Sequence, residues 1–276
     1  MKKYNLALQS ALLSALLPAL LSAPLIMLAG CAAKGPGGQA PQEELATASD
    51  QSGSQRRAQI RLELAVDYYQ QHQLPVALDE IKQALQADPN LADAYSVRAL
   101  IYMDMGETRL ADDNFLRALK LSPNNPDFAN NYGWFLCQNG RAADSIGYFD
   151  SALKVRSYQY PSKALNNAGL CSLKLKNEVA AERYFKQAFQ FDPGNPSAAY
   201  NLAKIHYDRH EYERAQFYLS RLLKADDFSV DVLWLAVKTE HKLGDRTVEN
   251  SLGSQLRRRY PASPEAAAYQ RGAFDE

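Results

Sequence analysis

The chain of 276 residues has no excess charge of either sign, because 31 lysines and arginines balance 31 aspartates and glutamates. Proteins that bind nucleic acid concentrate basic side chains that neutralise phosphates, so this balance gives no electrostatic reason to expect a nucleic acid partner. The sequence also contains no Gly-rich phosphate loop after a strand and no strand-to-helix turn that would carry a nucleophilic serine. We therefore expect no enzymatic activity, no cofactor and no small-molecule substrate.

Histidine and cysteine are scarce, with four and three copies. His206 and His210 have an i, i+4 spacing on a predicted helix that would suit zinc, but no third ligand lies nearby in the sequence. We expect two solvated histidines and no metal site. Cys137 has no obvious histidine partner in the sequence that could make it a catalytic nucleophile.

A spaced set of small residues and proline recurs along the chain. The set is Ala77, Ala84 and Pro89, then Ala111, Ala118 and Pro123, then Ala181, Ala188 and Pro193. A period near 34 residues is typical of stacked helical hairpins, because one such unit cannot bury its apolar face alone. The sequence therefore predicts one elongated array, in which function depends on a surface.

The repeat can be aligned in successive frames, with small residues at positions 8, 20 and 27 and larger apolar or aromatic residues at positions 11 and 24. The frames lie near 58–91, 92–125, 126–159, 162–195, 196–229 and 230–263. Small residues let paired helices approach closely, and the larger ones fill the space between turns. This pattern resembles the tetratricopeptide repeat, which implies an all-α superhelix of about six helical hairpins. We assign it to residues 55–263, followed by a C-terminal tail at 264–276.

The N-terminus has the features of an export signal. Lys2 and Lys3 precede an acid-free, Leu/Ala-rich stretch, which ends in Leu28-Ala29-Gly30-Cys31. Because the stretch exceeds the usual apolar region of a signal peptide, an uncleaved membrane anchor is the alternative. Pro18 and Pro24 and the ending argue against that anchor.

The tetrapeptide that ends at Cys31 resembles the bacterial lipoprotein box, in which the cysteine is acylated and becomes the first mature residue. This resemblance predicts a signal peptide at 1–30 and lipidation of Cys31. Residues 32 and 33 are Ala rather than Asp, which by resemblance to Gram-negative lipoproteins implies an outer-membrane location, facing the periplasm. Residues 31–54 are rich in Ala, Gly, Pro, Gln and Ser and are predicted to form a flexible tether.

Three strings narrow the resemblance: Asn130-Asn131-Tyr132-Gly133-Trp134-Phe135-Leu136-Cys137, Leu165-Asn166-Asn167-Ala168-Gly169-Leu170-Cys171 and Leu256-Arg257-Arg258-Arg259-Tyr260-Pro261. They resemble the PilF/PilW family of type IV pilus biogenesis lipoproteins. For that family the implied role is a pilotin, which binds the secretin PilQ and promotes its outer-membrane localisation and multimerisation. The alternative is a general periplasmic adaptor that uses the same repeats and anchor to recruit a cell-wall hydrolase or another envelope partner.

Cys137 and Cys171 lie 34 residues apart, on the first helices of adjacent predicted repeats. Neighbouring first helices pack side by side, and the periplasm is oxidising. We expect a disulfide, with two inert buried thiols as the alternative.

A partner surface follows from helical geometry, because positions 2, 5, 9, 12 and 13 of each first helix face the concave side of such arrays. With asparagines at the adjacent position 6, the predicted groove contains Val66, Tyr69, Leu100, Met103, Asn130, Asn131, Trp134, Lys163, Asn166, Asn167, Leu170, Tyr200, Asn201, Lys204 and Tyr207. Aromatic side chains and amides of this kind could hold a helix or an extended peptide. The alternative for several of them is packing between helices. Trp134 is the strongest single candidate.

Overall fold

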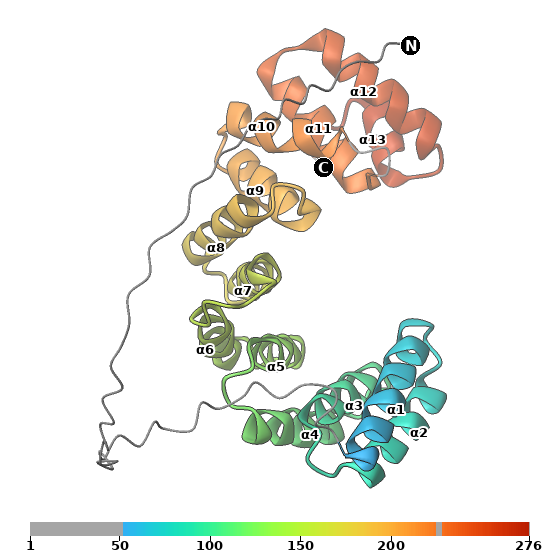
Figure 1. Cartoon of the computed structure of the whole chain (residues 1–276). Coiled ribbons are helices and arrows are strands. Elements are labelled where there is room, and N and C mark those ends of the chain that lie inside the picture. The colour runs from blue at the N-terminus through green and yellow to red at the C-terminus, as the bar shows by residue number, and fades with distance from the viewer. Residues whose placement is uncertain (1–51, 225–227, 276) are drawn as a thin grey trace, which may run out of the picture. The chain divides into compact units, whose positions relative to one another are not determined.

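The computed structural model describes residues 52–224 and 228–275, and over these ranges it contains thirteen α-helices and no strand (Figure 1). The helices are α1 (Gly53–Gln70), α2 (Leu74–Ala87), α3 (Ala92–Asp104), α4 (Thr108–Leu121), α5 (Pro126–Gln138), α6 (Ala142–Leu153), α7 (Pro161–Lys174), α8 (Glu178–Phe191), α9 (Pro196–Asp208), α10 (Tyr212–Leu222), α11 (Val230–Leu243), α12 (Arg246–Arg259) and α13 (Pro264–Arg271). The predicted signal peptide and nearly all of the tether lie outside the described residues.

Six antiparallel helix pairs account for α1 to α12, and each pair packs against the next. The odd-numbered helix of every pair also contacts the odd-numbered helix of the following pair. The all-α array of about six hairpins that the 34-residue period predicted is therefore confirmed. Among the helices in the described part of the chain, none combines the length and the apolar character needed to cross a bilayer.

The turn inside each hairpin uses one residue with positive φ, always at position 15 of the frame. Glycine occupies this position in Gly106, Gly140 and Gly244, whereas His72, Lys176 and His210 adopt φ values of 56°, 56° and 62° without being glycine. A left-handed residue ends the first helix and lets the second begin within a few residues. His210 is therefore a turn residue beyond the end of α9.

Small residues at position 8 make room for the large side chain at position 24 of the same hairpin. A Cβ atom added to Gly133 would lie 2.9 Å from the Phe149 ring, and one added to Gly169 would lie 2.5 Å from the Phe185 ring. Both phenylalanines are fully buried. Close helix approach in the third and fourth hairpins therefore depends on glycine.

Replacing Gly169 with Ala should lower the free energy of unfolding by about 1 to 3 kcal/mol, because the new methyl group would overlap the Phe185 ring. Denaturant titration followed by circular dichroism would measure the loss. Gly147→Ala is the matched control, since Gly147 is exposed on α6 and an added Cβ meets nothing within 4 Å. That control should be neutral or stabilising. Equal destabilisation by both changes would contradict the packing argument.

Residues 264–276, expected as a tail, begin with a helix, so the description as a tail needs correction. Ser263 caps α13 through the backbone N–H of Ala266, Pro264 occupies its first turn, and Gly272 ends it in a left-handed conformation. Tyr269 of α13 packs on Gly253 of α12, where an added Cβ would lie 2.0 Å from the ring. Gly253 stands at position 24 of the sixth frame, and because it has no side chain, Tyr269 can pack there and bring α13 against α12.

Candidate partner-binding face

The first helices of the six hairpins together form one surface, here called the odd-helix face: the solvent-facing side of α1, α3, α5, α7, α9 and α11 that carries the predicted groove residues. All predicted groove residues except Asn130 keep part of their surface exposed. Val66, Leu100, Met103, Trp134 and Leu170 also pack partly against the core beneath them. The face therefore combines half-buried apolar side chains with asparagines and exposed lysines.

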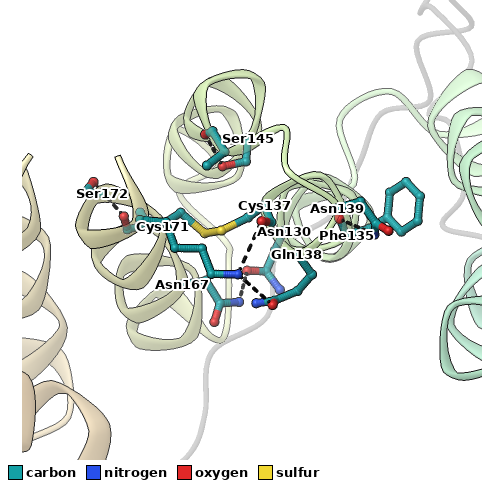
Figure 2. The surroundings of a disulfide bond; sticks show 12 residues. Asn130, Phe135, Cys137, Gln138, Asn139, Ser145, Asn167, Cys171 and Ser172 are labelled. Atoms are coloured by element: carbon teal, nitrogen blue, oxygen red, sulfur yellow. Dashed lines mark hydrogen bonds between the residues drawn. A yellow bond between two sulfur atoms is a disulfide. The ribbon is translucent and has the colours of Figure 1, made fainter. Parts of the chain in front are cut away.

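Asn130 is fully buried and does not belong to a surface that a partner could touch, which corrects the prediction. Its Oδ1 accepts a 3.0 Å hydrogen bond from Asn167 Nδ2 (Figure 2). Its Nδ2 donates to Asn131 Oδ1 at 3.3 Å. Asn130 lies where α5 and α7 meet, so its side-chain amide forms a hydrogen bond with a residue of the neighbouring helix. These amides connect two hairpins, and only Asn131 and Asn167 retain exposed surface.

Beside this amide pair, Cys137 of α5 and Cys171 of α7 form a disulfide with sulfur atoms 2.07 Å apart (Figure 2). Their Cα atoms are 5.9 Å apart, within the range a disulfide spans, and both side chains are buried. The Lys174 ammonium crosses the same boundary and donates to Gln138 Oε1 at 2.8 Å. The centre of the odd-helix face is thus covalently connected.

A phenol connects the first two hairpins in a similar way. Tyr69 of α1 donates a 2.8 Å hydrogen bond to Asp104 Oδ2 at the end of α3. Burial, followed by the hydrogen bond and the negative charge of Asp104, raises the pKa of Tyr69 well above its usual range. The phenol therefore stays protonated and remains a donor at physiological pH.

Two cavities open near the helix starts of the C-terminal half. One, of about 440 Å³, is lined by Lys163, Asn166 and the exposed rings of Tyr160 and Phe191; the Asn166 Oδ1 atom is buried without a hydrogen-bond partner. A second, of about 550 Å³, is lined by Tyr200, Asp231 and Phe228. Lys163, Asn166 and Tyr200 were predicted for the groove from their position numbers alone. Asn201 lies beside Tyr200 and uses its amide to bond the Ser197 carbonyl at 2.8 Å.

The expectation of two solvated histidines is wrong for His206. This side chain is 2% exposed, contacts Glu211 Oε2 through Nδ1 at 2.8 Å, and stacks on Tyr218 with ring centroids 5.7 Å apart. His206 stands at position 11, where Tyr68 and Tyr102 stand in the first two frames. This position is partly buried in the first two hairpins and fully buried in the later ones, where Leu136, Ser172, His206 and Glu240 occupy it. No group of three metal-ligating side chains occurs in residues 52–224 and 228–275.

The prediction missed the odd-helix face of the sixth hairpin. Positions 5, 9, 12 and 13 of that frame are Trp234, Lys238, His241 and Lys242, and the two lysines lie near Tyr207 of α9. The position rule used for the earlier frames would have found them. This part of the face carries more positive charge than the centre.

Comparisons with known proteins agree with this architecture. Family models described as tetratricopeptide repeat match residues 96–162 and 173–238. The type IV pilus assembly protein PilF of Pseudomonas aeruginosa is 29% identical over 209 residues, covering 76% of this chain and 83% of that protein.

Two solved structures of the same kind match nearly along their whole length. The crystal structure of PilW, a widely conserved type IV pilus biogenesis factor, has 31% sequence identity and a TM-score of 0.68, and the match covers 77% of this chain and 98% of that one. The structure of Pseudomonas aeruginosa PilF has 28% identity and a TM-score of 0.74, covering 80% of this chain and all of that one (100%). The chain therefore belongs to the PilF/PilW family of tetratricopeptide-repeat proteins of type IV pilus biogenesis.

Proposed function

We propose that this protein is a pilotin, a non-enzymatic assembly factor that binds a protomer of the pilus secretin and promotes its localisation and multimerisation in the outer membrane. The observation that carries the proposal is membership of the PilF/PilW family together with an odd-helix face of half-buried apolar side chains. Surfaces of this kind hold a helix or an extended peptide, because apolar pockets receive its side chains while nearby amides satisfy polar groups.

The proposed anchor is a lipid on Cys31, after removal of residues 1–30, with residues 31–54 as the tether to the array at 55–263. Cys31 lies outside the described residues, and its role rests on the sequence that surrounds it. A mature bacterial lipoprotein carries more than one acyl chain, and two or more chains give stable membrane attachment where one gives only reversible binding. The array would thereby be held at the periplasmic face of the outer membrane.

Deleting the gene should remove most of the secretin multimer from the outer membrane, and the wild-type gene should restore it. Membrane fractionation followed by gel analysis of heat-resistant secretin multimers measures this. A Cys31→Ser variant should bind secretin in solution but fail to place the multimer in the outer membrane, because it lacks the anchor.

Normal secretin multimers in the deletion strain would contradict the pilotin proposal. Affinity capture of the acylated protein from envelopes tests which partner it binds. Enrichment of a peptidoglycan hydrolase without secretin would instead support the general adaptor.

A further inference from the structure

The end of the chain folds back onto the odd-helix face of the sixth hairpin. Gly272 adopts a left-handed conformation after α13, and the Ala273 backbone N–H bonds the Ala268 carbonyl at 2.9 Å. This turn brings Phe274 onto α11, where its ring stacks on His241 at a centroid distance of 3.7 Å and on Trp234 at 5.9 Å. Trp234 and His241 stand at positions 5 and 12, which belong to the face that the earlier hairpins leave open.

The next residue makes a charged contact on the same helix. Asp275 Oδ1 lies 2.9 Å from the ammonium of Lys242, at position 13. The hydrogen bond and the positive charge of Lys242 lower the pKa of Asp275. The segment therefore inserts an aromatic ring and places a carboxylate on a neighbouring lysine, which is how a short peptide occupies a repeat surface.

A second lysine on this surface forms no ion pair within the described residues. Lys238 lies one turn before Lys242, and its ammonium is 5.6 Å from the centre of the Tyr207 ring and 5.5 Å from that of Trp234. No carboxylate of the described residues lies within ion-pair distance of it. Partial burial, followed by repulsion from Lys204, lowers the pKa of Lys238, and the more distant carboxylates of Asp208 and Asp275 offset only part of this effect. A carboxylate from a ligand would relieve this repulsion and gain a charge-assisted hydrogen bond.

We propose that the odd-helix face of α9 and α11 binds an extended segment of a partner protein in which an aromatic residue is followed by acidic residues, and that Phe274 and Asp275 occupy this site from within the chain. The aromatic ring of the partner takes the place of Phe274 against Trp234 and His241, and its carboxylates contact Lys242 and Lys238. The site is distinct from the apolar surface around Trp134, and it does not require the partner to be the secretin.

If Phe274 and Asp275 occupy the site, they compete with any peptide that binds there. A segment joined to its site by a short connection acts at an effective concentration in the millimolar range, so a free peptide must displace it. Removing Phe274 should therefore increase the affinity for a free peptide about tenfold or more. A partner protein would gain access by carrying a longer or more acidic segment.

The test uses a fluorescein-labelled peptide with the sequence Gly-Ala-Phe-Asp-Glu and an amidated end, titrated with the full chain in detergent. Fluorescence anisotropy should show about tenfold tighter binding to the Phe274→Ala variant and to a chain ending at Gly272 than to the wild type. A peptide with Ala in place of Phe, or with Asn and Gln in place of the acids, should bind less well. Adding Lys238→Gln to Phe274→Ala should weaken binding severalfold, whereas Lys82→Gln, on the exposed side of α2, should not.

Because Phe274 also covers α11, hydrogen exchange of α11 and α12 must show that the variants keep these helices. Phe274→Ala leaves Tyr269 and its seat on Gly253 in place, so it remains informative even if the shortened chain loses α13. Equal affinity of the wild type and the folded Phe274→Ala variant would overturn the proposal, since it would show that the segment does not compete for the site. Equal binding of the acidic and neutral peptides would overturn it as well.

Discussion

Reducing the disulfide between Cys137 and Cys171 is expected to lower the free energy of unfolding by about 2 to 4 kcal/mol. The bond closes a loop across a sequence separation of 34 residues, so it restricts the unfolded chain. In a repeat array each hairpin contacts only its neighbours, so the loss should concentrate where the bond is. We expect amides of α5 to α8 to lose protection, and those of α1 and α2 to change little. Denaturant titration and hydrogen exchange, with and without dithiothreitol, measure both effects.

The Cys137→Ala, Cys171→Ala double variant serves as the control for this experiment. Its stability should match the reduced wild type, apart from the two small cavities left by the sulfur atoms, and should not respond to dithiothreitol. A wild type whose stability also ignores the reductant would contradict the prediction. A loss spread evenly over all hairpins would contradict the local coupling.

Replacing Trp134 with Ala is expected to weaken secretin binding about 30-fold or more, because a central tryptophan in an interface commonly contributes 2 kcal/mol or more when truncated. Trp134 is half-buried at position 9 of the third hairpin and keeps part of its surface exposed. Within the described residues its indole N–H has no acceptor, so a partner can supply one. Isothermal calorimetry with the purified secretin protomer would give the affinity.

Two controls separate binding from folding in this case. Trp134 packs partly against the core around Cys137 and Phe149, so circular dichroism must show that the variant keeps its helices. Leu116→Ala removes an apolar side chain that is 44% exposed from α4, outside the odd-helix face, and should leave the affinity unchanged. Unchanged affinity in the folded Trp134→Ala variant would exclude Trp134 from the interface.

The repeat period predicted the helical hairpins because the same physical need, burial of one apolar face per hairpin, recurs in every frame. The period also placed Cys137 and Cys171 on neighbouring helices, and the structure joins them. The prediction was wrong where the residue type and its position in the repeat indicate different environments. Histidine suggests a solvated or metal-binding side chain, but position 11 is buried from the third hairpin onward, so His206 is buried there like Leu136 and Ser172.

The assignment of Asn130 to the groove was wrong for a related reason. A position number gives the direction of a side chain from its own helix but not the location of the next hairpin. Asn130 points toward α7 and is covered by it, which only the packing of two helices reveals. The packing of Phe274 on α11 likewise depends on residues far apart in the sequence. Ser263, Pro264 and Gly272, by contrast, are ordinary sequence signals for the start and end of α13.

The contact between positions 8 and 24 restricts how the sequence of this family can diverge. Gly133 and Gly169 face phenylalanines, whereas the sixth frame has Val237 at position 8 and Gly253 at position 24, where Tyr269 of α13 fills the space. A single substitution that enlarges one of the two residues gives an overpacked hairpin, and one that reduces the size of either residue leaves a cavity. Related chains should therefore change the sizes of these two residues together in the third and fourth hairpins, whereas in the sixth hairpin the residue at position 24 should change together with the one that takes the place of Tyr269.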